Sequence, residues 1–219
     1  GVIMDERLTA AQAREVMEQR AAIYEFLSIA YGEEVPLAFL RSLREQGPAL
    51  DGELGDFVAS LAGADDAALE AVRTDLAAEY ARVFLGMSRR PVAPYESVYT
   101  SPTGLMMQEA RDEVVALYRR EGFSVDESMH LPEDHIAFEL GFMAGLIRNA
   151  MAALDAGDGA EAERLAAVQE SFVADHLASW VPSLAQDVEK RAATGFYRGL
   201  AALTRDFIEA EADDLAASR

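Results

Sequence analysis

Hydrophobic residues recur at helical spacing along nearly the whole chain. Near the N-terminus, Met17, Tyr24 and Tyr31 follow one another every seven residues, which predicts a long amphipathic helix over residues 8–31. Further helices are predicted from the spacing of apolar residues, with Pro or Asp at their starts and Gly at their ends. Gly47-Pro48 marks a break between two of them. These helices are expected over 36–46, 51–62, 65–86, 103–121, 132–155, 160–180, from Pro182 onward, and 194–210.

The segment 132–155 predicts the central helix of a bundle. Pro132-Glu133-Asp134 is typical of a helix start, because proline fits the first turn and carboxylates favour the positive end of the helix dipole. Apolar residues then occupy two sides of the expected helix, which indicates burial over most of its circumference. One side carries Ile136, Leu140, Met143 and Ile147, and the other carries Phe138, Phe142 and Leu146.

Residues 87–102 form the one long stretch without helical periodicity. Their prolines exclude a regular helix interior there. The chain shows neither the alternation of a β-hairpin nor a repeat of fixed period. We therefore expect an all-α fold, a single helical-bundle domain over residues 1–219 with about eight to ten helices and one long proline-containing loop. The pattern also allows two lobes joined by the 87–102 connector.

Composition narrows the classes of function. The 219 residues are 51% hydrophobic and 26% charged, with a formal net charge of −20 and no cysteine. Without cysteine, disulfide scaffolds, thiolate zinc sites and cysteine-ligated iron–sulfur clusters are excluded. The apolar fraction is too high for a disordered acidic chain. A surface this acidic repels nucleic acid and anionic lipid, so the charge favours a cationic partner.

The sequence shows no pattern typical of a secretory signal or a membrane-spanning helix. Residues 1–7 lead into a charged amphipathic stretch rather than the apolar core of a secretory signal. No window approaches the roughly 18 uncharged apolar residues of a membrane helix, so we expect no stable membrane insertion. Ser88-Arg89-Arg90 is similar to a twin-arginine export signal, but it is internal and prolines rather than an apolar run follow it. The simplest expectation is a cytoplasmic protein.

Metal chemistry is one alternative, since helical bundles can hold di-metal carboxylate sites. One Glu-x-x-His pair exists, at Glu127 and His130, but a second is missing. His135 and Glu139 share a helix face and fit either a ligand pair or an ion pair. Catalytic-triad, P-loop and dinucleotide motifs are lacking. We expect no metal, no cofactor and no catalysis, with a metal-binding bundle enzyme or an acidic interaction module for an unrelated partner as alternatives.

Four segments, in this order, carry a family resemblance. They resemble the TorD-like family of redox-enzyme maturation chaperones, which includes TorD and DmsD and, more distantly, NarJ. The second and third segments are specific in combination. The segments are Glu79–Gly86, Pro94–Tyr99, Pro132–Met143, and Phe172 to Trp180 followed by Phe196 to Phe207.

The resemblance implies an all-helical, cytoplasmic, non-enzymatic chaperone. Such a protein binds the twin-arginine signal peptide of a molybdopterin-containing oxidoreductase and holds the apoenzyme for cofactor insertion before export. It implies a monomer or a helix-swapped dimer, for which residues 87–102 are a suitable hinge. It also implies the residues that line the peptide-binding region. These are Tyr95, Glu96, Ser97, Tyr99, Asp134, His135 and Glu139.

The chemistry of these residue types agrees with such a ligand. Arginine pairs with carboxylates through charge-assisted, bidentate hydrogen bonds, so Glu96, Asp134 and Glu139 are suitable acceptors. The apolar part of the peptide needs an apolar groove, and the candidate residues for it are aromatic. They are Tyr95, Tyr99, Phe138 and Phe142. His135 beside carboxylates suggests a pH dependence of binding.

Overall fold

The computed structural model describes residues 9–46 and 49–218, and within these ranges it is all-helical, as the sequence predicts. One isolated antiparallel bridge between Tyr95 and His135 is the β-type pairing recorded among these residues. The α-helices are α1 (Ala10–Gly32), α2 (Leu37–Gln46), α3 (Gly52–Ser60), α4 (Asp66–Phe84), α5 (Glu96–Thr100), α6 (Glu109–Glu121), α7 (Ile136–Asp155), α8 (Gly159–Phe172), α9 (Ala178–Arg191) and α10 (Gly195–Ala217). A 3-10 turn spans Glu127–Met129, and a π-helical turn spans Val173–Leu177.

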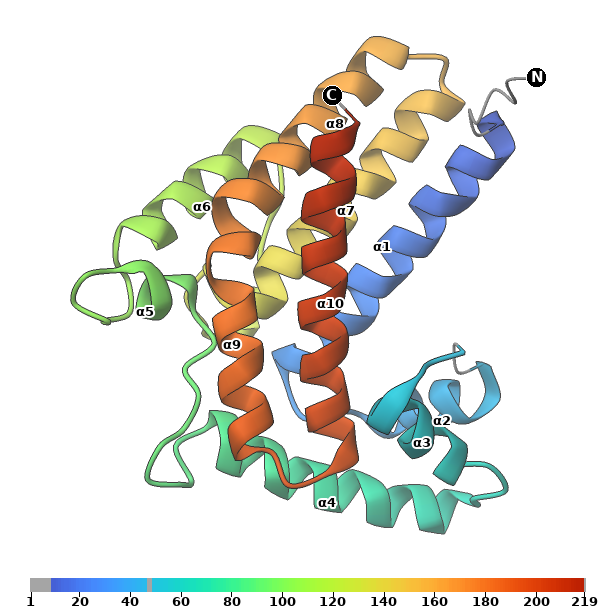
Figure 1. Ribbon diagram of the computed structural model, residues 1–219, viewed down its shortest axis with the longest axis vertical. Helices are drawn as coiled ribbons and strands as arrows, with labels where there is room; N and C mark the ends of the chain where they lie inside the picture. Colours follow the sequence, from blue (N-terminus) through green and yellow to red (C-terminus); the bar gives the residue numbers. More distant parts are fainter. Residues whose placement is uncertain (1–8, 47–48, 219) are drawn as a thin grey trace, which may run out of the picture.

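Helix α7 is the centre of the bundle, with α1 along one side and α8 along another, while α10 runs beside them and α4 crosses the base (Figure 1). Among the described residues, α7 alone is long and apolar enough to cross a membrane by length and composition. However, 67% of its apolar window is buried inside the protein. Its apolar circumference is therefore explained by core packing, as the sequence predicts.

Polar contacts fasten the outer helices to the bundle. On α10, the Glu211 carboxylate accepts hydrogen bonds from the Arg20 guanidinium and from the Tyr24 hydroxyl of α1. At the base, Glu79 of α4 accepts from the backbone N–H groups of Ala193 and Thr194, at 3.0 and 3.1 Å. These bonds hold the turn between α9 and α10 on α4, which fixes the base of the molecule.

The expected helix over 103–121 begins later than predicted, at Glu109. Gly104 and Met107 have φ values of +65° and +59°, which a right-handed helix excludes. The backbone N–H of Gln108 instead donates to the Ser97 hydroxyl. The neighbouring stretch 87–102, predicted to lack helix, contains the short helix α5 within it.

Helix α7 likewise begins at Ile136 rather than at Pro132. His135 is the N-cap residue, and its Nδ1 accepts a hydrogen bond from the Ala137 N–H at 3.0 Å. Glu133 and Asp134 therefore precede the first turn, and their carboxylates bond to other segments. The predicted start of this helix at Pro132 is therefore too early, and a histidine nitrogen rather than a carboxylate caps its first turn.

The prediction that a helix starts at Pro182 is wrong, because this proline lies inside α9. The π-helical turn joins α8 to α9 without a break, and Pro182 lies beyond that turn, within α9. The same turn brings His176 inward, since Val173, His176 and Leu177 are all buried. The predicted break at Gly47-Pro48 lies outside the described residues.

Candidate functional site

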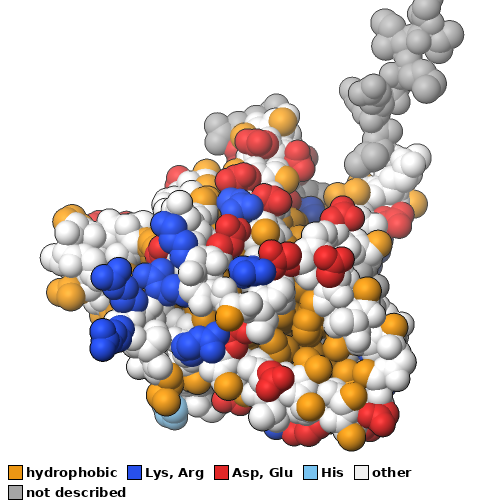
Figure 2. Space-filling view, turned by 60° about the horizontal axis from the view of Figure 1, so that its bottom comes forward, with side chains coloured by type: hydrophobic (Ala, Val, Ile, Leu, Met, Phe, Trp, Pro, Cys, Tyr) orange, Lys and Arg blue, Asp and Glu red, His pale blue; other side chains and the backbone are white. Residues whose placement is uncertain are grey.

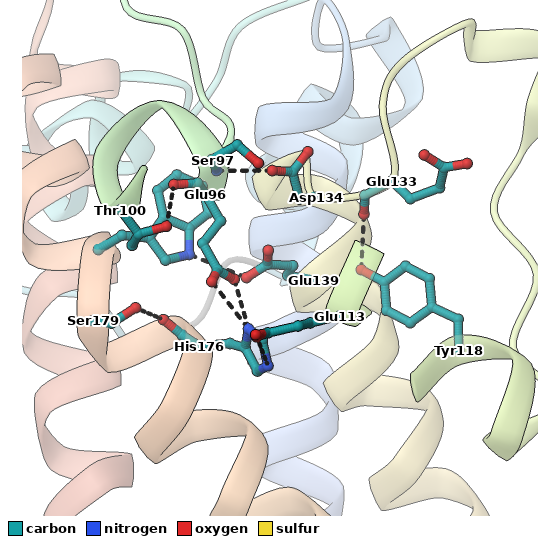
Figure 3. Close-up of polar contacts among 11 residues, drawn as sticks. Glu96, Ser97, Thr100, Glu113, Tyr118, Glu133, Asp134, Glu139, His176 and Ser179 are labelled. Atoms are coloured by element: carbon teal, nitrogen blue, oxygen red, sulfur yellow. Dashed lines mark hydrogen bonds and ion pairs between the residues drawn. The ribbon is translucent and has the colours of Figure 1, made fainter. Parts of the chain in front are cut away.

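The segments Pro94–Tyr99 and Pro132–Phe142, about 40 residues apart in sequence, lie side by side. The Ile136 N–H donates to the Pro94 carbonyl at 2.9 Å, and the Glu96 N–H donates to the Asp134 carbonyl at 3.1 Å. The Asp134 side chain accepts from the Ser97 N–H at 2.8 Å, and this carboxylate serves the first turn of α5 (Figure 3). The predicted residues of the two segments are thus brought together by their backbones.

Beneath this contact lies a group of buried polar side chains, which we call the buried acid cluster: Glu96, Asp134, Glu139, His176 and Trp180. His176 Nδ1 lies 2.9 and 3.0 Å from the two carboxylate oxygens of Glu96 (Figure 3). The Trp180 indole N–H donates to Glu139 at 3.1 Å. The cluster therefore connects α5, α7 and the segment from the π-helical turn into α9.

Burial sets the charge of the acids in this cluster. Glu139 is fully buried, and burial first, then the nearby Glu96 carboxylate, raises the pKa of Glu139 well above its usual value. Burial also raises the pKa of Asp134, against the hydrogen bonds from Ser97 that lower it. Burial and the nearby carboxylate thus favour the neutral, protonated form of Glu139, because adjacent buried carboxylates repel each other when both are ionised.

The pKa values of the two histidines near the contact are shifted in opposite directions. Burial lowers the pKa of His135 to about 3, so its ring is neutral, in agreement with an Nδ1 that accepts a hydrogen bond. For His176, burial alone lowers the pKa, but Glu96 and Glu113 outweigh it and the net pKa is raised. Glu113 approaches His176 Nε2 at 3.7 Å from the exposed side. The neighbouring carboxylates thus favour the protonated form of His176, whose Nδ1 lies against Glu96.

The predicted aromatic residues lie on different sides of this contact. Phe142 is in the core, where its ring packs against Tyr118 and Phe172, each with a centroid distance of 4.9 Å. The half-buried Tyr99 packs on Trp180, and its hydroxyl donates to Asp187 at 2.7 Å. Tyr95 alone combines a half-buried ring with an open cavity in front of it.

The nine predicted site residues fall into two groups, half-buried and buried. Tyr95 and Tyr99 are half-buried, whereas the side chains of the others lie inside the protein and bond or pack there. Glu96, Asp134 and Glu139 are 3%, 0% and 0% exposed, so they do not present carboxylates to solvent. Their direct contact with a peptide stays a prediction.

The cavity beside Tyr95, which we call the Tyr95 pocket, has a volume of about 670 Å³. It lies between the end of α1, the C-terminal part of α4 and the bridge that joins Tyr95 to His135. Most of its lining is apolar or aromatic, as is usual for ligand pockets. The lining includes Val35, Pro36, Leu37, Tyr80, Phe84, Leu85, Pro94, Tyr95, Met129, Leu131 and His135.

Two exposed carboxylates lie at the edge of the Tyr95 pocket. Glu33 and Glu34 follow the last turn of α1 and line the cavity beside the apolar residues. Arg73, an arginine in the same lining, is bonded to Glu70 at 2.9 Å through its Nε. Sequence reasoning missed Glu33 and Glu34, although two consecutive acids after a long helix, with Pro36 close behind, are a visible signal.

The described residues contain no cluster of side chains suited to bind a metal ion. No group of three or more His, Asp or Glu side chains there is placed to hold an ion. His135 and Glu139, which the sequence allows as either a ligand pair or an ion pair, bond to different partners: His135 accepts from Ala137, and Glu139 accepts from Trp180.

Comparison with known proteins identifies the family. The family model described as nitrate reductase delta subunit matches residues 47–186. The chaperone protein TorD of Vibrio atlanticus is 30% identical over 91% of this chain and 95% of its own length. The TorD chaperone of Vibrio cholerae (strain O395) is 29% identical, with 88% and 90% covered. The chain belongs to the TorD/NarJ family of redox-enzyme maturation chaperones.

The match to the family model includes some parts of the candidate site and leaves out others. The matched residues include α4, both bridged segments and the π-helical turn, and hence all nine predicted site residues. Glu33 and Glu34 precede the match. The acidic edge of the Tyr95 pocket thus belongs to a part of the chain that the TorD/NarJ model does not describe.

Proposed function

We propose that this protein is a cytoplasmic, non-enzymatic chaperone that binds a twin-arginine signal peptide in the Tyr95 pocket. The peptide belongs to a molybdopterin-containing oxidoreductase, which the chaperone holds as apoenzyme for cofactor insertion before export. The chaperone acts as a monomer or as a helix-swapped dimer. The names of the TorD relatives support the chaperone role, and the shape and charge of the pocket support the choice of ligand.

The observation that carries the proposal is an apolar pocket with unpaired carboxylates at its edge. A twin-arginine peptide has a basic segment followed by an apolar one. The apolar segment fits against Tyr95, Phe84 and Leu85, where burial contributes about 25 cal/mol per Å² before ordering costs. The arginines fit Glu33 and Glu34, which have no other cation within ion-pair distance among the described residues.

The buried acid cluster has a positioning role in this proposal. Glu96 and Asp134 hold α5 and the segment before α7 together, and that contact places Tyr95 and His135 at the pocket. Ser97, Tyr99, Phe138, Glu139 and Phe142 act through the same packing. A change in the cluster therefore acts on the peptide through the pocket wall.

A calorimetric titration tests the proposal. A twin-arginine signal peptide of a molybdopterin oxidoreductase is expected to bind with one site per chain, and binding should weaken as salt is added. A peptide with both arginines replaced by alanine, and one with a polar residue in its apolar segment, should each bind at least about tenfold more weakly. Equal affinity for all three peptides would contradict the proposal.

A further inference from the structure

A second pocket, at the C-terminal ends of α4 and α9, is lined mainly by basic residues. It has a volume of about 480 Å³. Among the described residues no acid lines it, although the chain carries 39 acids against 19 bases. Lys and Arg side chains gather on one side of the face that Figure 2 draws. The lining, which we call the basic pocket, is Arg82, Val83, Ser88, Arg89, Arg90, Lys190 and Arg191.

This pocket differs from the rest of the surface because several of its cations have no acidic partner among the described residues. Elsewhere most arginines pair with acids; Arg41 with Asp66 at 3.0 Å is an example. In the described part of the chain, Arg89, Arg90 and Lys190 have no recorded ion pair. Placing unpaired cations together raises their mutual repulsion, which a bound anion removes.

Helix ends account for only some of these cations. Arg82, Lys190 and Arg191 lie in the last turns of α4 and α9, where cations stabilise the negative end of the dipole. Arg89 and Arg90 lie in the loop after α4, beyond any helix end. Their presence in the same pocket needs a different reason.

The backbone of this loop is held in place. Gly86 turns it with φ of +78°, and the Val92 N–H donates to the Val83 carbonyl at 2.7 Å. The Arg191 Nε–H donates to the carbonyl of Arg90 at 2.6 Å. The backbone that carries Arg89 and Arg90 is thus held in place before a ligand arrives, which lowers part of the ordering cost of binding.

We propose that the basic pocket binds a small ligand through a phosphate or diphosphate group. Arginine and lysine are the side chains that phosphate oxygens prefer, and Ser88 adds a hydroxyl donor. Within the part of the chain that the structure describes, Val83 is the one apolar residue of the lining, so the pocket suits the phosphate part of a ligand rather than an aromatic ring. A small anion feels chiefly the charges within about 8 Å at physiological ionic strength, whereas a nucleic acid or an anionic membrane meets the net charge of −20.

Calorimetric titration of the full chain with inorganic pyrophosphate, at constant ionic strength, tests this inference. The wild-type protein should bind in a saturable manner with one site, and the double variant R89S/R90S should bind at least about tenfold more weakly. The control R14S/R41S removes the same charge from exposed arginines that pair with Asp155 and Asp66. Its affinity should change by less than about twofold.

Three outcomes would overturn the inference. They are no saturable binding to the wild type, an equal loss in both double variants, and binding of a tetraglutamate peptide as tight as that of pyrophosphate. The last would assign the basic pocket to an acidic protein segment. Lys190→Gln, on α9 rather than on the loop, should also weaken pyrophosphate binding and guards against a local change in the loop.

Discussion

The contact between Pro94–Tyr99 and Pro132–Phe142 has two sides with opposite properties. On the inner side, Glu96 and Glu139 are buried and bond to His176 and Trp180. On the outer side, Tyr95 and His135 form a wall of the open Tyr95 pocket. Adjacent residues in the same short segments therefore serve internal cohesion and a binding surface. Substitutions on the two sides should separate into effects on stability and effects on peptide affinity.

The largest effect is expected for Trp180→Ala on the inner side. The fully buried indole fills the core and donates to Glu139, so its removal leaves both a cavity and a buried carboxyl without its partner. We expect a loss of about 3–5 kcal/mol in the free energy of unfolding, measured by urea denaturation. Leu105→Ala, at a side chain 60% exposed, is the control and should change stability by less than about 0.5 kcal/mol. A small loss for Trp180→Ala would show that the inner side is not a stabilising core.

The sequence predicts one side of this contact much better than the other. Helical periodicity correctly predicts α1, α4, α7 and α10, because each buries an apolar stripe. It does not predict the burial of Glu96 and Glu139, since carboxylates are ordinarily exposed. Their burial depends on His176 and Trp180, whose positions follow from a π-helical turn that leaves no sign in the hydrophobic pattern.

Helix boundaries show the same limit of sequence reasoning. The start of α6 at Glu109 depends on the left-handed conformation of Met107, a residue that seldom adopts it. The start of α7 depends on a cap by the His135 ring nitrogen, where the sequence favours the preceding carboxylates. In both cases a contact with Pro94–Tyr99 outweighs the local preference: the Ser97 hydroxyl bonds to Gln108, and the Asp134 carboxylate bonds to Ser97.

The next largest effect is a pH dependence centred on Glu139. Its folded pKa is raised, so the unfolded chain releases this proton from about pH 4.5 upward while the folded protein keeps it. That term lowers wild-type stability as pH rises toward the folded pKa. Glu139→Gln carries no such proton. Its stability relative to wild type should therefore rise with pH, by at most about 1.4 kcal/mol per pH unit.

Urea denaturation at several pH values between about 5 and 8 measures this difference. The neutral His135, with its pKa lowered to about 3, acts in the opposite direction, because stability gains as pH rises past its folded pKa toward its unfolded one. Subtracting the unfolding free energy of the wild type from that of the variant at each pH removes the contribution of His135, which both proteins share. Glu163→Gln, at an exposed acid, should give a flat difference. A flat difference for Glu139→Gln as well would mean that Glu139 is ionised in the folded state.

A smaller effect, on affinity rather than stability, is expected from the tyrosines on the two sides. Tyr95→Ala removes part of the pocket wall and should weaken signal-peptide binding about tenfold or more. Tyr99→Phe removes only the hydroxyl that donates to Asp187, away from the pocket, and should leave the affinity within about twofold. Titration calorimetry distinguishes them. Equal losses in both variants would place the peptide across α5 rather than in the Tyr95 pocket.

The smallest effect is expected from the acidic edge of the pocket. Glu33→Gln with Glu34→Gln should weaken peptide binding about fivefold, mainly at low salt, because exposed charge pairs are individually modest. Stability should be unchanged within about 0.5 kcal/mol. Glu163→Gln with Glu209→Gln, at exposed acids away from the pocket, removes the same charge and serves as the control. Equal losses in the two double variants would indicate a general effect of net charge.

The most direct test of the central claim is a double-mutant cycle between the acidic edge and the peptide. Wild type and the Glu33→Gln, Glu34→Gln variant are each titrated with the twin-arginine peptide and with its double-alanine form. If the arginines bind these carboxylates, the alanine substitutions should cost the variant less than the wild type, with a coupling of about 0.9 kcal/mol at low salt, which is the whole of the variant's loss. Losses that add independently, within about 0.5 kcal/mol, would contradict the assignment of the twin-arginine peptide to the Tyr95 pocket.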